Sequence, residues 1–411
     1  MSKDSTAKTI KVVYSTRVIP HYRIPLLEAL AKDPRITFRV ITTRDRKGSK
    51  AQNFRGPINF DLVKLWAWRP AIYTRNGKAE LSVPLGLGRN LFRFSPDVVI
   101  TEGASHVFSN ITAFIYAKLF RRRIVQWSLG ELRNRKLSLP RRLLNAVCFH
   151  AIERKSDAAI AYSETGAAYF ERIGMPKEKI VVALNTIDTK DRIAKHKAYA
   201  DTHELAYPSP CPEVFNITYV GALIDVKRPA LLIEAFTKVS KEIPNSRLSI
   251  AGDGPLREEL EAQVNSAGLS DRVSFWGHIS DEMPRFFYDA SVLVMPGLGG
   301  LVIPDALAHG VPVICNEGDG SEKDIVTEQC GLLLPQMDSA QLADALVKLA
   351  HDRGKQSRWR AARYERSTKN SQSKTTTTTF IGLLRLLLVA DATRTDVRND
   401  NCETQIKQTS W

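Results

Sequence analysis

The sequence predicts an α/β protein with two doubly wound domains joined by a polar segment. Short apolar strands alternate with amphipathic helices in two separate series, which is typical of parallel sheets covered by helices. Residues 191–213 separate the two series and are polar with three prolines. The chain has 411 residues, and a chain of that length forms two or three hydrophobic cores. Both domains are therefore expected to be Rossmann-like.

The first series forms the predicted N-terminal domain, residues 1–190. Its strands are expected at residues 10–14, 38–42, 98–101, 124–127 and 158–161, with a helix at residues 24–31. The pattern stops near residues 181–188, so we expect a linker at residues 191–213.

The second series forms the predicted C-terminal domain, residues 214–365. Its strands are expected at residues 216–220, 247–251, 273–276, 292–295 and 311–315. Its helices are expected at residues 229–241, 256–267, 281–289, 303–309 and 340–350. Residues 366–411 are expected to form a helix and a polar tail. Doubly wound domains bind ligands beyond the carboxyl ends of their strands, so a ligand is expected in a cleft between the two domains.

The charge of the chain is uneven. Residues 1–200 hold 37 Lys and Arg against 16 Asp and Glu, a net charge of +21, while the remaining residues carry −6. The basic half indicates an acidic partner: nucleic acid, an anionic membrane or a phosphorylated substrate. A basic surface kept for solubility is the alternative. The sequence has no zinc-finger spacing, RNP-like aromatic run or basic zipper, so we do not expect nucleic acid.

Cysteine usage and hydropathy predict a cytoplasmic location. Five widely spaced cysteines without a CxxC pair are typical of reduced thiols. The N-terminus lacks the apolar stretch of a signal peptide, and the longest late apolar run is about half a membrane span. Residues 139–152 are basic and amphipathic at helical spacing, so a peripheral position at the inner membrane face stays open. An ordinary core-facing helix is the alternative for that segment.

The most informative segment is VLVMPGLGGLVIPDALAHGVPV, residues 292–313. It predicts a buried strand, a glycine turn and a helix. Gly297, Gly299 and Gly300 let the backbone approach a ligand, and amides at a helix start attract phosphate. Asp305 lies one turn into the helix, where a carboxylate can accept two hydrogen bonds from a ribose diol. The alternative is an ordinary strand-to-helix turn with a locally capping Asp305.

With this segment in place, residues 216–335 resemble the donor domain of family 4 glycosyltransferases, which have the GT-B fold. Four stretches carry the resemblance in the family's order and spacing: ITYVGALIDVKRPALLIEAF, LSIAGDGPLREEL, VSFWGHIS and PGLGGLVIPDALAHGVPVI. The first half resembles the acceptor domain of the family more weakly, through DAAIAYSETGAAYFERIGMPKEKIVVALNTID. The resemblance implies a retaining transfer of a sugar from a nucleotide diphosphate sugar to an acceptor hydroxyl, without a metal cofactor.

The resemblance also implies roles for single residues. Lys227 would contact the donor diphosphate, a role that suits lysine, and Asp305 would hold the ribose; these two are the predicted catalytic residues. Without the family, Lys227 would be an ordinary surface charge. The predicted donor-binding residues are Gly221, Arg228, His278, Ile279, Gly297, Gly299, Gly300, Leu301 and Asp305. Of these, Gly300 and Leu301 would offer amides to the phosphates, and His278 and Ile279 would line the base.

The chain departs from the family at several positions. Ala222 stands where the family has Arg, Gly297 stands at the first acidic position of the signature, and Leu129 stands where a His is frequent. Asp305 replaces a Glu, and a PG-x-x-GL variant of the signature exists within the family. Arg228 is our hypothesis for the charge lost with Ala222. The departures keep two alternatives open: a non-catalytic subunit of the same fold that binds a nucleotide or glycan, and a GT-B-fold sugar epimerase.

The first domain offers candidates for the acceptor side. Arg17, His21, Tyr22 and Arg23 follow the first strand, Glu102 ends the strand at residues 98–101, and Glu131 follows a later strand. The carboxyl-end rule places such residues toward the ligand, expected here to be a glycan or lipid-linked acceptor. Packing of the loop is an equal alternative for His21. No HxxxH or DxD group occurs at a strand end, so no metal site is predicted.

Overall fold

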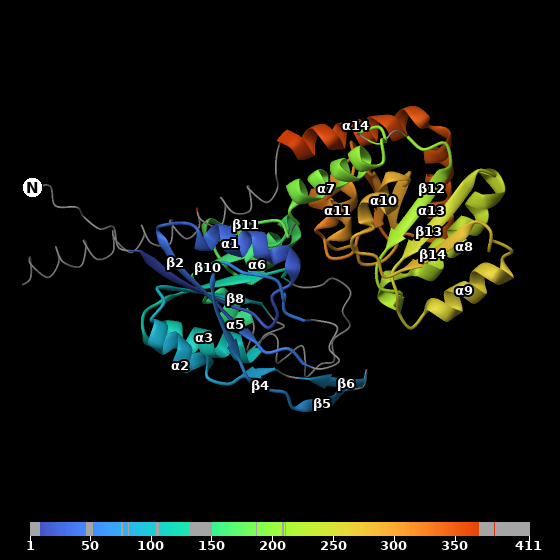
Figure 1. The fold of residues 1–411 in the computed structure, drawn as a ribbon. Helices are drawn as coiled ribbons and strands as arrows, with labels where there is room; N and C mark the ends of the chain where they lie inside the picture. Colours follow the sequence, from blue (N-terminus) through green and yellow to red (C-terminus); the bar gives the residue numbers. More distant parts are fainter. Residues whose placement is uncertain are drawn as a thin grey trace, which may run out of the picture. The chain divides into compact units, whose positions relative to one another are not determined.

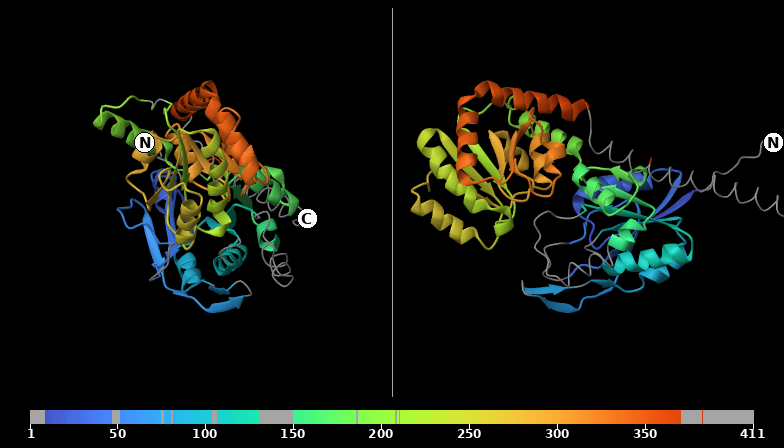
Figure 2. Two further views of the ribbon diagram at one scale, coloured as in Figure 1. Left: turned by 90° about the vertical axis from the view of Figure 1, so that its right-hand side faces the viewer. Right: turned by 180° about the vertical axis from the view of Figure 1, so that it is seen from behind.

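The computed structural model describes residues 9–46, 52–74, 77–80, 82–103, 107–130, 150–185, 187–207, 209, 211–369 and 382. The chain divides into two compact units: the first holds the described residues up to Ala183 together with residue 382, and the second holds those from Leu184 to Lys369. Figures 1 and 2 show that each unit contains a twisted sheet with helices packed on its faces.

The first unit contains a seven-stranded sheet whose strands pair in parallel, in the order β11-β10-β9-β8-β1-β2-β3. The strands are β1 (Ile10–Ser15), β2 (Ile36–Thr43), β3 (Asp61–Leu65), β8 (Val98–Glu102), β9 (Arg123–Ser128), β10 (Ala158–Ala161) and β11 (Ile180–Val182). The helices are η1 (His21–Arg23), α1 (Ile24–Ala31), α2 (Leu87–Phe94), α3 (Val107–Leu119), α5 (His150–Arg154), α6 (Glu164–Arg172) and η3 (Lys177–Lys179). Two antiparallel pairs, β4 (Ala67–Trp68) with β7 (Val83–Pro84) and β5 (Ala71–Thr74) with β6 (Gly77–Glu80), extend the unit.

Strand β1 shows why the first sheet is doubly wound. Its residues 12–14 are all apolar because both faces of a parallel sheet are buried. Val12 packs in a cluster with Leu27 of α1, on one face. Val13 points to the other face and packs with Leu91 of α2 and Ala113 of α3. The doubly wound fold that the alternating pattern predicts is therefore confirmed in this unit.

The second unit contains a six-stranded parallel sheet in the order β14-β13-β12-β15-β16-β17. Its strands are β12 (Phe215–Val220), β13 (Ser246–Ala251), β14 (Val273–Gly277), β15 (Val292–Met295), β16 (Val313–Asn316) and β17 (Gly331–Leu334). Its helices are α7 (Thr189–Thr202), η4 (Asp225–Lys227), α8 (Pro229–Glu242), α9 (Arg257–Ser266), α10 (Met283–Tyr288), α11 (Val302–Ala308), α12 (Glu322–Ile325), α13 (Ser339–His351) and α14 (Arg353–Lys369). In chain order the strands read 3-2-1-4-5-6, the Rossmann order.

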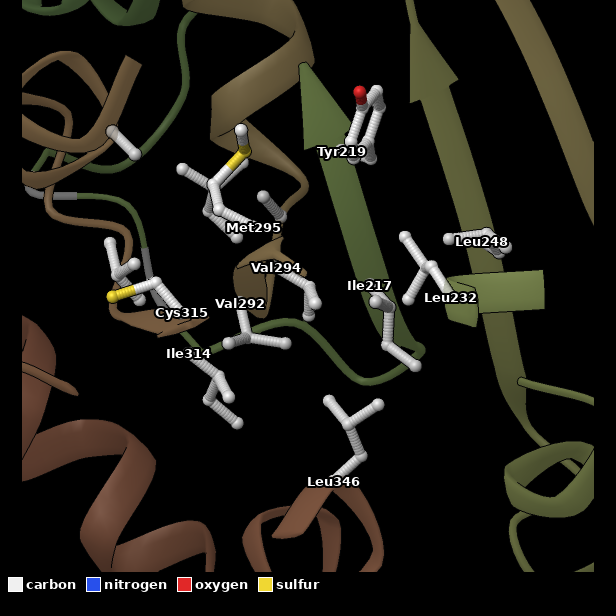
Figure 3. Close-up of a cluster of buried hydrophobic side chains, with 14 of the residues drawn as sticks. Ile217, Tyr219, Leu232, Leu248, Val292, Val294, Met295, Ile314, Cys315 and Leu346 are labelled. Atoms are coloured by element: carbon white, nitrogen blue, oxygen red, sulfur yellow. The ribbon is translucent and has the colours of Figure 1, made fainter. Parts of the chain in front are cut away.

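The core of the second unit lies on both faces of the central strands β12 and β15 (Figure 3). All four residues of β15 are fully buried, which explains the unbroken apolar run VLVM. Leu232 of α8 and Leu346 of α13 are also fully buried in this cluster, and Figure 3 shows both side chains directed toward Ile217. This packing holds the carboxyl ends of β12 and β15 in place.

The structure corrects the predicted linker and two boundaries. Residues 191–202 of the segment predicted as a linker lie in helix α7 (Thr189–Thr202), which belongs to the second unit. The helix begins because the side chain of Asp188 accepts hydrogen bonds from the backbone N–H groups of Lys190 and Asp191. It buries His196 and Ala200. The units divide after Ala183 rather than residue 190, and α14 runs across the predicted boundary at residue 365.

Some predictions lie outside the described residues. These are the candidate Glu131 and the tail beyond residue 369 apart from residue 382. The amphipathic segment 139–152 also lies outside them except for its last three residues, which belong to α5.

Candidate functional site

The sheet of the second unit reverses its strand order between β12 and β15. Ligands of doubly wound sheets bind in the crevice beyond the carboxyl ends of the strands at such a point. Two loops lie there, residues 221–228 after β12 and residues 296–301 after β15. The reversal therefore brings Lys227 and the glycine turn, which are about 70 residues apart in the chain, to the same edge of the sheet.

Lys227 lies directly on the glycine turn. Its Nζ donates to the backbone carbonyls of Leu298 at 2.5 Å and Gly299 at 2.7 Å. Burial lowers the pKa of Lys227, and the charges of Asp319 and Glu322 oppose that shift. An ammonium has three N–H donors, and the described residues take two of them. The arrangement leaves one donor for an anionic ligand at the turn.

The glycines of the turn are required for different reasons. A Cβ built on Gly297 would lie 2.3 Å from the carbonyl oxygen of Val226 and 2.7 Å from Cα of Lys227, so no side chain fits there. At Gly299 a Cβ would lie 2.5 Å from Cδ1 of Ile303. Gly300 has a φ of +99° and open space around its Cα. The turn is therefore closely packed at Gly297 and exposed at Gly300.

Asp305 is buried against helix α7. Its carboxylate Oδ1 lies 3.3 Å from Nε of Arg192 and 3.5 Å from Nδ1 of His309, and only 7% of the residue is exposed. The His309 ring also contacts the Asp305 backbone carbonyl at 2.8 Å, and burial lowers the pKa of His309 to about 4, so the ring is neutral at pH 7. The role of Asp305 toward a ribose stays a prediction, and a ribose would have to share this carboxylate with Arg192.

Arg228 connects loops within the second unit. It adopts the left-handed conformation with a φ of 53°. Its guanidinium donates to the backbone carbonyls of Pro296 at 3.3 Å and Met337 at 2.9 Å. These bonds connect the loops that hold Pro296 and Met337, so Arg228 has a structural role next to the glycine turn. Its contact with a diphosphate stays a prediction.

The remaining predicted donor residues lie at the same edge of the sheet. The loop at Gly221 packs against the loop at Gly252, because a Cβ built on Gly252 would lie 1.9 Å from the Gly221 carbonyl oxygen. Ala222 is exposed beside it. His278 is exposed and Ile279 is half-buried, directly after the edge strand β14. Leu301 is half-buried and precedes α11.

Sequence reasoning missed two charged residues of this region. Arg192 lies in the segment that was expected to be a linker, and the signal that marks its helix is the capping residue Asp188. Glu322 is fully buried at the start of α12. Glu322 could have been found from the sequence as an acidic residue in the loop GDGSEKD, which follows the strand at residues 313–316.

In the first unit, Arg23 and Glu102 form an internal ion pair at the carboxyl ends of β1 and β8. Nη1 of Arg23 lies 2.8 Å from Oε1 of Glu102, and the guanidinium lies 3.9 Å from the Trp127 ring centroid. The hydroxyls of Tyr14 and Thr16 also donate to Glu102, at 2.5 and 2.8 Å. Burial raises the pKa of Tyr14 well above its usual value, although the Arg23 charge opposes the shift. Because Arg23 is only 6% exposed, its contacts are with the protein.

The other first-unit candidates are more accessible. Arg17 and His21 are exposed, and Tyr22 is half-buried with its ring 5.8 Å from that of His21. Leu129, at the position where the family often has His, is half-buried. The acceptor roles of all these residues stay predictions.

Among the described residues, no group of three or more His, Cys, Asp and Glu side chains is arranged to hold a metal ion. Within the same part of the chain, no helix combines the length and apolar character needed to cross a bilayer.

A glycine-rich turn before a helix, at the switch point of a Rossmann-like sheet, is typical of nucleotide-binding α/β domains. Residues 212–366 match the family model of glycosyl transferases group 1. This segment is therefore a group 1 glycosyltransferase domain, and the resemblance that the sequence predicts is confirmed.

Curated relatives agree with this assignment, and a solved structure agrees with the fold. The chain is 29% identical over 140 residues to an alpha-D-kanosaminyltransferase of Streptomyces kanamyceticus, covering 33% of this chain and 36% of that protein. It is 29% identical over 149 residues to a GDP-mannose-dependent alpha-(1-6)-phosphatidylinositol monomannoside mannosyltransferase of Mycobacterium tuberculosis, covering 34% and 39%. The chain thus spans little more than a third of the length of these relatives.

The crystal structure of Anabaena Alr3699/HepE in complex with UDP matches this chain with a TM-score of 0.67 at 16% identity. The match covers 92% of this chain and all of that chain, which confirms the GT-B fold.

Proposed function

We propose that the protein is a glycosyltransferase that moves a sugar from a nucleotide diphosphate sugar to an acceptor hydroxyl. The observation that carries the proposal is Lys227 placed on the glycine turn at the switch point, within the segment that matches the family model. Relatives that act as kanosaminyl- and mannosyltransferases support a role in the biosynthesis of glycans, polysaccharides or glycolipids, with a glycan or lipid-linked acceptor. Retention of the anomeric configuration belongs to the proposal through the family resemblance alone.

In this proposal the second unit binds the donor. The diphosphate accepts hydrogen bonds from the third N–H of Lys227 and from the backbone at Gly300 and Leu301. The ammonium thereby supplies positive charge without a metal ion. Asp305 holds the ribose, with Arg192 orienting the carboxylate. His278 and Ile279 line the base. The first unit, through Arg17, His21 and Tyr22, receives the acceptor.

The experiment is a thermal-shift measurement of the full chain with UDP, GDP, ADP and CMP. We expect one nucleoside diphosphate to raise Tm by several degrees, since at 100 times its Kd a ligand adds about 2.7 kcal/mol to stability. Lys227→Met removes the ammonium, so it should weaken nucleotide binding and make this shift much smaller. Lys238→Met, an exposed lysine of α8, is the matched control and should keep it. A chain that responds to none of the four nucleotides contradicts the proposal.

A non-catalytic nucleotide-binding subunit is the second candidate. Gly297 has no room for the acidic side chain of the family signature, and Ala222 contributes no charge to the diphosphate. Turnover of the donor that binds decides between the two. Transfer to an acceptor establishes the enzyme, an altered donor sugar without acceptor indicates the epimerase, and binding without turnover indicates the subunit.

We also propose a peripheral contact with an anionic membrane at one surface of the first unit. The α2–α3 patch consists of Phe92, Ile115, Leu119 and Phe120, which are 47–72% exposed. The rings of Phe92 and Phe120 lie 5.8 Å apart, and Figure 1 shows α2 beside α3. Exposed basic residues accompany it: Arg89, Arg93, Lys118 and Arg121. Aromatic side chains among basic residues favour the surface of anionic lipid.

A further inference from the structure

Glu322 is a buried acid to which none of the predicted donor-binding roles is assigned. It is the first residue of α12, and its side chain is completely buried. Its Oε2 accepts a hydrogen bond from the backbone N–H of Gly320 at 3.0 Å. Its Oε1 is buried and has no hydrogen-bond partner among the described residues. An unpaired buried oxygen destabilises a fold, so this residue requires an explanation.

The unpaired oxygen lies between two loops of the site. A Cβ built on Gly299 would lie 3.0 Å from Oε1 of Glu322, and one built on Gly318 would lie 2.7 Å away. Gly299 belongs to the turn after β15, and Gly318 belongs to the loop after β16. These strands are paired neighbours in the sheet. Glu322 therefore fills the space between adjacent loops at the carboxyl edge, and both glycines leave room for it.

Charges connect Glu322 with Lys227. The charges of Asp319 and Glu322 favour the ammonium form of Lys227, while the ammonium donates to the carbonyls of the glycine turn. Burial raises the pKa of Glu322, and the charge of Asp319 adds to the effect. Asp319 itself accepts hydrogen bonds from the backbone and hydroxyl of Ser321. Glu317, in the same loop, is paired with Lys323 at 2.8 Å.

We propose that Glu322 is a positioning residue of the donor site, which holds the glycine turn and Lys227 in place for the diphosphate. The inference rests on the proposed function. Gly297 has no room for a side chain, so the acid at the first signature position of the family cannot be accommodated there. Glu322 supplies a carboxyl group to the same turn from the neighbouring loop. It acts through the turn and Lys227 and does not touch the donor, because its oxygens are buried.

The test compares nucleotide affinity in four variants of the full chain. The ligand is whichever of UDP, GDP and ADP stabilises the wild type most, and Kd is measured by calorimetry on protein shown to be folded. Glu322→Gln keeps the length and the bond to Gly320 but removes the charge that favours the ammonium form of Lys227, so its Kd should rise, although less than in Glu322→Ala. Glu322→Ala and Glu322→Asp lose contact with the turn, and we expect Kd to rise about tenfold or more, since small displacements of positioning groups have effects of this size. Glu317→Gln is the matched control and should bind as the wild type does.

A double-variant cycle tests whether Glu322 acts through Lys227. If it does, adding Glu322→Ala to Lys227→Met should change Kd by no more than about twofold, because coupled residues are not additive. If the fold-changes in Kd of the two single variants multiply in the double variant, the proposal is overturned. A Glu322→Ala chain with a lower Tm and an unchanged Kd would also overturn it. If Glu322→Ala does not fold, Glu322→Asp and Glu322→Gln carry the same comparison. A wild type that binds no nucleoside diphosphate overturns the proposed function itself, which separates the two failures.

Discussion

Gly297 occupies the point where the turn after β15 meets the backbone of Val226 and Lys227. The contact is between main chains, since a Cβ at this position would lie 2.6 Å from the carbonyl carbon of Lys227. This contact keeps Lys227 next to the carbonyls that its ammonium binds. The missing acid of the signature therefore has a steric explanation in this chain.

Restoring the family's acid by Gly297→Glu should damage the site rather than improve it. Overpacking costs about 1–3 kcal/mol, and a side chain forced against backbone atoms should reach at least that range. The expected result is a lower Tm of the second unit, by roughly 2–4 °C for each kcal/mol in a domain of this size, together with loss of nucleotide binding. Thermal unfolding with and without nucleotide measures both effects.

Ala222→Ser, at an exposed position of the facing loop, is the control for Gly297→Glu and should leave Tm within about 1 °C, as for most surface substitutions. A Gly297→Glu chain with normal Tm and tighter nucleotide binding would contradict the steric explanation.

Helix α7 packs on the rest of the second unit through buried polar side chains. The rings of His196 in α7 and His309 at the end of α11 lie 4.9 Å apart, edge to face, and both residues are 2% exposed. Burial lowers the pKa of His196 to about 3 and that of His309 to about 4. Arg192 of the same helix meets the Asp305 carboxylate. The helix therefore supports the residue predicted to bind ribose.

The histidine pair predicts a loss of stability in mild acid. Both rings are neutral in the folded chain, whereas in the unfolded chain they take up protons below their ordinary pKa of about 6.5. Stability should therefore fall as the pH decreases from about 6.5 toward 4, with each histidine contributing up to about 1.4 kcal/mol per pH unit. Denaturant unfolding at several pH values in this range measures the slope.

His309→Gln should make the slope of stability against pH shallower, by about one proton's contribution. His351→Gln, an exposed histidine at the end of α13, is the control and should leave the slope unchanged. An equal slope in wild type and His309→Gln would show that the pair does not determine the acid response.

At the scale of the whole molecule, the basic charge and the exposed apolar side chains occur in the same unit. Residues 1–200 carry +21, and the remaining residues carry −6. The α2–α3 patch also belongs to the first unit, with Trp66 and Trp68 exposed on the same unit. Attraction of basic residues to an anionic surface falls off within a Debye length, so it depends on salt.

We expect the protein to float with vesicles that contain anionic phosphatidylglycerol and to remain unbound with pure phosphatidylcholine vesicles. Phe92→Ser combined with Phe120→Ser should weaken binding about tenfold or more, because each buried aromatic contributes roughly 1.5–3 kcal/mol. Trp276→Ser, an exposed aromatic of the second unit, is the control. Binding that is equal for both vesicle types would refute the membrane contact, and binding unaffected by the double variant would place it on another surface.

Much of the fold was predictable because the strands are short, apolar and buried on both faces. The helix at residues 24–31 and the strands at residues 158–161 and 292–295 have the bounds that the pattern predicts. Other elements were missed where that pattern is weak. The strand β3 is only partly buried, and α7 has a polar sequence whose helical signal is a single capping aspartate. In such segments the tertiary contacts decide the structure.

The sequence by itself determined the doubly wound class, the glycine turn and the family of residues 212–366, because apolar periodicity and glycine spacing are local properties. Only the tertiary structure decided which charged groups meet. Lys227 with the turn, Asp305 with Arg192 and Glu322 with Gly299 are contacts between residues from about 20 to more than 100 positions apart. Their burial, and hence their pKa values and hydrogen-bond partners, follows from strand order, which brings distant loops to one edge of the sheet.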